Sequence, residues 1–255
     1  MQPTLFGHKA MDKTFRSLLL VPADSTAHLA RAAESGADVL IIDLDDMVAP
    51  DHKAAARMAA LACLSDLTDK PNAPQLWVRV NGLASGMIDD DLRMIMAAAP
   101  RAIMLPEARN GADLQHLGAK LAVHEAEYNL PDGATRIVPL VTDTGASIFG
   151  LSTYAGCSPR LLALAWGTDK LAADMGANDP RTDNANWPAP FALARNLTLF
   201  AAASAGVPAI DTICSKIGDD ASLRQEAIRA KADGFGAKLA RHCDQIAPIN
   251  QIFTP

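Results

Sequence analysis

Charged side chains gather at the ends of apolar runs in this sequence. The carboxylates at these positions are Asp43, Asp45, Asp46, Glu107, Asp143, Asp169 and Asp211, and the cations are Arg79, Lys170 and Lys238. Taken singly, an Asp that follows a strand is commonly the N-cap of the next helix. Taken together at one edge of a fold, so many carboxylates repel one another unless a cation or an anionic ligand balances them. The set therefore points to metal binding or to stabilisation of charge on a substrate.

The residue types narrow that chemistry. The six histidines show no HxxxH or HxH spacing and the four cysteines no CxxC spacing, so neither a zinc site nor a disulfide framework is expected. Oxygen ligands without clustered His or Cys suit Mg²⁺ or Mn²⁺. Arg79 offers a planar fork for a carboxylate or an enolate. His242 remains open between ligand contact and a local capping or packing role.

Eight apolar runs of strand length must position these residues. They span residues 17–23, 39–45, 76–81, 102–107, 136–143, 161–167, 208–213 and 235–241. Their continuous apolar character predicts strands that are buried on both faces, as in a parallel sheet. Alanine-rich amphipathic stretches at 25–36, 52–67 and 112–129 predict intervening helices, and helix ends are expected at Gly36, Gly150, Gly206 and Gly234.

This alternation over 255 residues predicts a single-domain α/β fold, the (β/α)₈ TIM barrel, over residues 16–255 after a tail at 1–15. An open doubly wound sheet is the alternative, but no GxGxxG follows the first strand and no P-loop is present. In a barrel of this kind the chemistry lies at the carboxyl ends of the strands, where the charged residues fall. The polar stretch 177–190 is expected to be either a solvated connection or a lid.

Composition excludes several classes of partner. The net charge is −6 and no basic block stands out, so nucleic acid and anionic membrane surfaces are not expected partners. No apolar run reaches the roughly 18 residues that a membrane span needs. The first residues lack the apolar segment of a secretion signal, and the scattered cysteines suit reduced thiols. We therefore expect a cytoplasmic protein.

Several sequence blocks occur together in one order. They are RSLLLVPADS, ADVLIIDLDDMVAPDHKAAAR, WVRVN, IMLPEA, VTDTGASIFG, SPRLLALAWGTDKLAADMGA, VPAIDT, GFGAKLARH and IAPINQIFTP. In this combination, over about residues 16–255, the chain resembles the citrate lyase β-subunit-like proteins of the HpcH/HpaI aldolase group. The resemblance implies a (β/α)₈ barrel that assembles as trimers or hexamers. It also implies cleavage of a 3-hydroxyacyl-CoA, such as citryl-, malyl- or citramalyl-CoA, into an acyl-CoA and a keto acid.

The resemblance also assigns roles to individual residues. Arg79 is expected to steady the enolate or oxyanion. Asp45 and Asp46 are expected to orient water bound to a Mg²⁺ ion, with Asp143 and Asp169 as the candidate metal ligands.

Substrate contacts are likewise implied by the resemblance. Coenzyme A is expected over the strand-one loop from Pro22 to Ser25, with Lys53 nearby, and Gly167 is expected to contact substrate.

Three positions depart from the family pattern. Asp143 replaces a Glu, Asp169-Lys170 replaces a Glu-Asp pair, and Glu107 replaces a Lys. The changes at residues 107 and 170 have opposite sign, so we predict that Lys170 and Glu107 form a charge-swapped ion pair and that Mg²⁺ binds weakly. The alternative is that Lys170 points outward as a solvated helix residue.

The sequence thus predicts a carbon–carbon lyase acting on acyl-CoA. Two different functions remain open beside it. One is that of a metal-deficient homologue that binds acyl-CoA with little or no lyase activity, and the second is that of an aldolase that acts on free hydroxy-keto acids.

Overall fold

The computed structural model describes residues 15–177, 187–214 and 218–254. Within them, eight strands form one parallel sheet in the order β5-β4-β3-β2-β1-β8-β7-β6. The strands are β1 (Ser17–Pro22), β2 (Val39–Asp43), β3 (Gln75–Arg79), β4 (Ala102–Leu105), β5 (Arg136–Pro139), β6 (Leu164–Ala165), β7 (Ala209–Asp211) and β8 (Ala237–Ala240).

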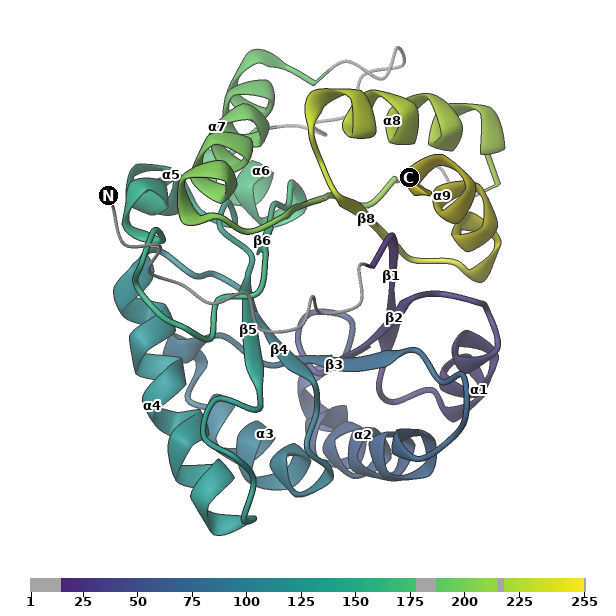
Figure 1. The fold of residues 1–255 in the computed structure, drawn as a ribbon, viewed down its shortest axis with the longest axis vertical. Coiled ribbons are helices and arrows are strands. Elements are labelled where there is room, and N and C mark those ends of the chain that lie inside the picture. The colour runs from purple at the N-terminus through teal and green to yellow at the C-terminus, as the bar shows by residue number, and fades with distance from the viewer. Residues whose placement is uncertain (1–14, 178–186, 215–217, 255) are drawn as a thin grey trace, which may run out of the picture.

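Helices follow each strand and surround the sheet (Figure 1). They are α1 (Thr26–Ala33), α2 (Lys53–Thr68), α3 (Ile88–Ile95), α4 (Gly111–Glu127), α5 (Gly145–Gly150), α6 (Asp169–Met175), α7 (Ala189–Ala205), α8 (Asp220–Asp233) and α9 (Ile246–Phe253). No helix in the described part of the chain is long and apolar enough to cross a membrane.

The sheet closes between β5 and β6. Parallel bridges join Ile137 to Leu161 and Leu140 to Ala165. The amide of Leu162 donates to the Ile137 carbonyl at 2.9 Å, and the amide of Val141 donates to the Ala165 carbonyl at 2.9 Å. The strands thus form the ring that Figure 1 shows end-on, and the predicted (β/α)₈ barrel is confirmed.

Alternate residues of each strand serve two different cores. Along β1, Leu18 and Leu20 belong to the cluster inside the barrel, whereas Leu19 and Val21 pack in the layer between strands and helices. The inner cluster includes Phe15, whose ring meets the Trp77 ring edge-on at 5.1 Å. Burial on both faces explains why the strands read as unbroken apolar runs.

The expected helix ends hold at all four glycines. Gly206 and Gly234 cap α7 and α8 in the left-handed conformation, and Gly36, also left-handed, closes the turn after α1. Gly150 is different, because it is the last residue of α5 with a φ of −87° and a 3-10 turn continues beyond it. Its requirement is space, since a Cβ there would lie 1.8 Å from the Arg109 carbonyl oxygen.

The strands are shorter than the apolar runs that predict them. The run 39–45 ends as a strand at Asp43, and the run 161–167 contributes only Leu164–Ala165. Beyond these points the chain leaves the sheet, so Asp45, Asp46 and Lys170 lie outside the strands. Most of the predicted loop 177–190 and nearly all of the predicted tail lie outside the described residues.

Candidate functional site

Arg79 is fixed by a buried carboxylate on the neighbouring strand. Asp43 and Arg79 are register partners at the ends of β2 and β3. Arg79 donates from Nε to Asp43 Oδ1 at 2.6 Å and from Nη2 to Oδ2 at 2.7 Å. The same carboxylate accepts the amides of Asp45 and Met47, so it also shapes the loop after β2. This two-point contact sets the plane of the guanidinium.

The guanidinium remains charged in its buried position. Arg79 Nη2 also donates to Asp46, whose side chain is 42% exposed at the rim. Burial alone would lower the pKa of Arg79, but the charges of Asp43, Asp46 and Asp45 outweigh it and raise the pKa above its usual value. Arg79 is therefore a permanent cation that faces the pocket.

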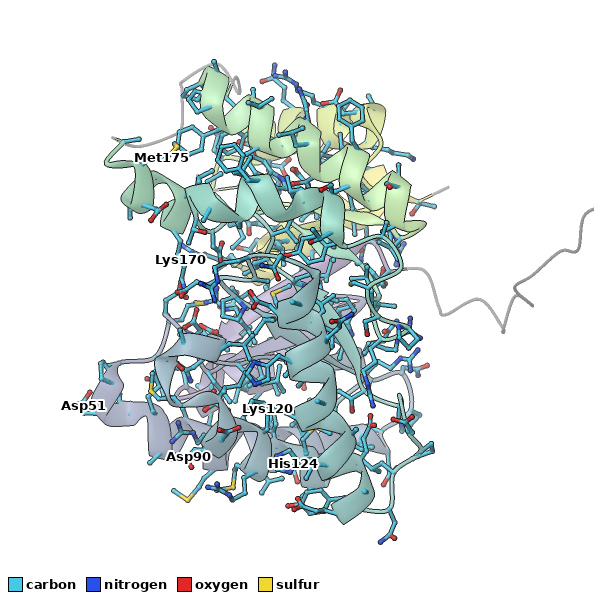
Figure 2. All side chains as sticks on the ribbon, turned by 90° about the vertical axis from the view of Figure 1, so that its left-hand side faces the viewer. Asp51, Asp90, Lys120, His124, Lys170 and Met175 are labelled. Atoms are coloured by element: carbon cyan, nitrogen blue, oxygen red, sulfur yellow. The ribbon has the colours of Figure 1, made fainter. Side chains whose placement is uncertain are left out.

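Lys170 reaches across the rim from the first turn of α6. Its ammonium donates to Asp45 Oδ2 at 2.7 Å and to Glu107 Oε1 at 2.9 Å. The predicted Lys170–Glu107 ion pair is therefore present, with Asp45 as an additional partner. Burial would lower the pKa of Lys170, but the hydrogen bonds to both carboxylates raise it. Figure 2 shows Lys170 on the side of the molecule that carries Asp51 and Met175.

Asp143 lies under this rim, almost fully buried after β5. Its Oδ2 accepts the backbone amide of Glu107 at 2.9 Å. Glu107 adopts a left-handed φ of +55°, a strained conformation for a residue with a side chain, and strain of this kind gathers at functional sites. Burial raises the pKa of Asp143 to about 6, although the Glu107 amide and the charges of Lys170 and Arg79 oppose the shift. A carboxyl with this pKa can hold or release a proton near neutrality.

A pocket opens over these groups at the carboxyl ends of the strands. It has about 50 Å³ of free volume, which suits a small acid group. Its lining residues are Leu20, Asp46, Arg79, Met104, Leu140, Asp143, Trp166, Gly167, Thr168, Asp169, Lys170, Thr212, Ile213, Leu239 and Arg241. The pocket thus combines an apolar base formed by barrel-interior residues with a charged rim.

A second, larger hollow adjoins the first. It measures about 220 Å³ and shares Leu20 and Arg241 with the pocket. It lies between the end of β1, helix α1 and the loop after β8, with His28 and Arg31 on its wall. Basic side chains beside an acid-binding pocket suit a substrate whose larger part carries phosphate groups.

The structure brings most of the predicted site residues together. Asp46, Arg79, Asp143, Gly167 and Asp169 line the pocket. A Cβ on Gly167 would meet Asp143 Oδ1 at 3.0 Å, so the absence of a side chain there lets the carboxylate approach the backbone. Asp169 is half exposed and faces Arg241, whose Nη2 lies 3.5 Å from its Oδ2.

Two predicted substrate contacts do not line the small pocket. Lys53 is buried, and its ammonium donates to the Leu44 and Asp45 carbonyls and to Asn81 Oδ1 at 2.6, 2.7 and 2.8 Å. All three of its donors are used to hold the loop after β2, so in this structure Lys53 has none to offer a substrate. Pro22, the last residue of β1, lines the second hollow and not the pocket.

The carboxylates at the rim do not form a metal-binding set. Among the residues that the structure describes, no group of three or more His, Cys, Asp or Glu side chains could hold a metal ion. Asp45 and Glu107 both bind the Lys170 ammonium, and Asp143 Oδ2 accepts the Glu107 amide. Mg²⁺ takes oxygen ligands in near-octahedral geometry, and the Lys170 ammonium that lines the same pocket offers no lone pair and repels the ion, so the charges present disfavour it.

Sequence reasoning missed three contributors. Asp43 was noted at its strand end but not as the residue that orients Arg79. Arg241 lines both hollows, and its place at the end of the predicted strand 235–241 was the available signal. Trp166 lines the pocket while its Nε1 donates to Asp211 Oδ1 at 2.8 Å, a link between β6 and β7 that the sequence gives no sign of.

A model of the HpcH/HpaI aldolase/citrate lyase family matches residues 16–243. The chain belongs to this family. Its relatives include citrate lyase subunit beta of Leuconostoc mesenteroides subsp. cremoris, at 26% identity over 94% of this chain and 77% of that protein. An L-malyl-CoA/beta-methylmalyl-CoA lyase of Cereibacter sphaeroides is 29% identical over 94% and 79%. A (3S)-malyl-CoA thioesterase of the same species is 30% identical over 94% and 78%.

Solved structures of family members share the fold. The citrate lyase beta subunit from Mycobacterium tuberculosis, complexed with oxaloacetate and magnesium, superposes with a TM-score of 0.78 at 27% identity, covering 95% of this chain and 98% of that one. CitE from the same organism, in complex with magnesium, acetoacetate and coenzyme A, gives 0.78 at 28% identity, covering 95% and 82%. These family members thus bind small oxo acids, and one of them binds coenzyme A.

Proposed function

We propose that this protein is a carbon–carbon lyase that cleaves or forms a 3-hydroxyacyl-CoA such as citryl-, malyl- or citramalyl-CoA. The observation that carries the proposal is the Arg79 guanidinium, which Asp43 holds in a fixed plane at the pocket. The relatives named citrate lyase subunit beta and malyl-CoA lyase support the class of substrate.

The chemistry places negative charge in the pocket. In the cleavage direction the 3-hydroxyl loses its proton to a base, the bond between the second and third carbons breaks, and its electron pair passes to a thioester enolate while the hydroxyl carbon becomes a carbonyl. Protonation of the enolate then gives the acyl-CoA. Arg79 is oriented in advance toward the charge that develops, and a fixed cation in a partly dry site stabilises such charge more than water does.

The two hollows divide the substrate between them. The small pocket suits the keto-acid part, and the adjoining hollow of about 220 Å³ suits part of the coenzyme A moiety. Arg31 and His28 on the hollow's wall supply donors for phosphate oxygens. Pro22 lines this hollow, in line with the expectation that coenzyme A lies over the strand-one loop.

The test is product analysis with a panel of CoA thioesters. Purified protein is mixed with malyl-CoA, citramalyl-CoA or citryl-CoA, with and without Mg²⁺, and both 2-oxo acid and free thiol are measured. A lyase releases 2-oxo acid or oxaloacetate without free thiol. Free thiol without 2-oxo acid would instead indicate a thioesterase like the 30% identical relative.

The same assay separates the lyase from a binding protein and from an aldolase. Saturable binding of the thioesters without turnover would indicate a homologue that only binds acyl-CoA. Turnover of free hydroxy-keto acids alone would indicate an aldolase that does not use coenzyme A. Either outcome would overturn the lyase proposal.

The assembly and the cellular setting are part of the same proposal. We propose a homo-oligomer, a trimer or hexamer, that works in the cytoplasm. The four scattered cysteines suit that setting, since their spacing is not that of a disulfide framework.

A further inference from the structure

Lys170 draws three separate segments of the chain together over the pocket. It lies in the first turn of α6, and it binds Asp45 after β2 and Glu107 after β4, which lie 125 and 63 residues away in sequence. Its side chain is only 25% exposed, and it lines the pocket beside Arg79 and Asp143. The ammonium is therefore a fixed part of the pocket wall.

An ammonium has three N–H donors, and two of them are taken by Asp45 and Glu107. The third is available to an oxygen atom of a bound ligand. Arg79, also at the pocket, has its Nε and Nη2 donors occupied by Asp43 and Asp46. The two Nη1 donors of Arg79 remain, so Arg79 and Lys170 can both donate to a ligand at the pocket.

We propose that the Lys170 ammonium is a resident cation of this pocket and donates its third N–H to a carboxylate oxygen of a 2-oxo acid without a divalent ion. The substrate class rests on the function proposed above. In this member of the family, the Lys170 side chain would then supply the positive charge beside the ligand.

The arrangement of charges carries this assignment. A divalent ion at the rim would lie beside an ammonium that repels it and offers no lone pair. Asp45 and Glu107 in turn keep the ammonium in place and balance its charge. A ligand carboxylate adds a favourable contact to this set without displacing either partner.

The first experiment measures binding of pyruvate, a minimal 2-oxo acid, by calorimetry. Wild-type protein is titrated once in EDTA and once in MgCl₂. The expected result is saturable binding in both, with dissociation constants that agree within threefold. Binding that Mg²⁺ strengthens tenfold or more would overturn the proposal, as would no binding in either buffer at 20 mM pyruvate.

Variants test the residue itself. Lys170→Gln together with Glu107→Gln removes both charges of the pair and should weaken pyruvate binding at least tenfold in EDTA. Lys170→Arg keeps the charge and should stay within fivefold of wild type, which guards against a double variant that fails to fold. Lys120→Gln is the matched control, because Lys120 is also 25% exposed and binds Asp89 at 2.6 Å between α4 and α3, away from the pocket (Figure 2). Unchanged binding in the double variant would overturn the proposal.

The reverse swap gives an independent result. Glu107→Lys with Lys170→Asp moves the positive charge to the loop after β4 and frees a carboxylate on α6, so pyruvate binding should become dependent on Mg²⁺ by tenfold or more. Pyruvate binding that stays independent of Mg²⁺ in this variant would count against Lys170 as the substitute for the ion. In the wild-type protein, reduction with borohydride that fixes pyruvate covalently to Lys170 would show an imine and overturn the ionic role.

These measurements do not depend on lyase turnover. Metal-free pyruvate binding that requires Lys170 would uphold the inference even if no CoA thioester is cleaved. Conversely, cleavage of a thioester by a protein whose pyruvate binding needs Mg²⁺ would uphold the proposed function and overturn the inference.

Discussion

At the scale of single residues, the site is a balance between buried charges. Asp43 is fully buried and does not line the pocket, yet it determines where the Arg79 guanidinium points. Asp45 and Glu107 hold Lys170 in the same way at the rim. Each of these two cations is thus positioned by carboxylates, and both line the pocket.

We predict that Arg79→Lys lowers kcat/KM for the cleaved thioester by tens-fold or more, on the order of 2 kcal/mol. A lysine keeps the charge but cannot bridge both oxygens of Asp43, so its ammonium is not held in one direction. Steady-state kinetics measure the effect. Arg57→Lys is the control, because Arg57 binds the buried Asp91 at 2.7 Å between α2 and α3 and does not line the pocket. Wild-type activity in Arg79→Lys would exclude the role.

We predict that Asp143→Asn stabilises the protein at alkaline pH. The pKa of Asp143 is raised from 3.8 to about 6 by burial, so above pH 6 the folded state holds a charge that the unfolded state holds more easily. Stability of the wild type should therefore fall as pH rises from about 4 to 6 and stay low above. The gain from Asn is about 3 kcal/mol at pH 8 and shrinks toward zero near pH 4.

Urea unfolding at a series of pH values measures this difference. A variant that is less stable than wild type at every pH would show that the Asp143 charge is compensated in the folded state. Pyruvate binding in the same variant separates stability from function, because a carboxyl that is costly to bury and lines the pocket is expected to serve the ligand.

Sequence reasoning reached some of these residue-scale contacts and not others. The Lys170–Glu107 pair was predictable from the family resemblance, which implied changes of charge of opposite sign at two positions on one rim. The burial of Lys53 was not, because its partners are two backbone carbonyls and Asn81, and no sequence pattern marks which carbonyls lack partners. The left-handed backbone conformation of Glu107 was equally unpredictable, since nothing about its residue type favours that φ.

At the scale of elements, short connections bring strand ends and helix starts into close contact. The end of α5 passes against the start of α4 so closely that Gly150 meets the Arg109 carbonyl and Gly111 meets the Thr153 carbonyl. The sequence predicted a glycine at a helix end for residue 150, but the reason is this approach of two backbones. Periodicity identifies elements one at a time and carries no information about such crossings.

We predict that Gly150→Ala destabilises the protein by about 3 kcal/mol or more, because the added Cβ would lie 1.8 Å from a backbone oxygen that cannot move cheaply. Gly36→Ala is the matched control. Gly36 has a φ of +77° but nothing within 4 Å of the added carbon, so its cost is the backbone term of about 1 kcal/mol. Thermal or urea unfolding compares the two. Equal losses would show that the α4–α5 contact relaxes freely.

At the scale of the whole molecule, the fold was predictable because both faces of every strand are buried. Eight unbroken apolar runs separated by helical stretches leave few arrangements besides a barrel. The interrupted pairing between β5 and β6 was not predictable. The residues that join β5 to β6 are as apolar as the rest, yet they contact through isolated bridges instead of a continuous ladder.

The outer surface of α7 gives a whole-molecule prediction about assembly. Leu193 and Phe200 lie seven residues apart on one face of the helix and are 57% and 70% exposed, and Phe149 on the adjacent α5 is 89% exposed. Large apolar side chains that share a surface mark an interaction site, and a second copy of this chain is the partner that a homo-oligomer requires. We predict that wild-type protein has three or six times the 26.9 kDa chain mass, and that Phe200→Glu lowers it toward one chain.

Light scattering coupled to size exclusion at micromolar concentration measures the mass. Met58→Glu is the control, because Met58 is 60% exposed on α2, on the opposite side of the ring from α7 (Figure 1). A monomeric wild type would exclude the assembly. An oligomer of unchanged mass in the Phe200→Glu variant would show that the interface does not include α7.

Because α7 follows β6 and packs against β6 and β7, contacts made there by a second copy would support the pocket wall that carries Trp166 and Lys170. The monomeric variant should therefore bind pyruvate more weakly even though no pocket residue is changed.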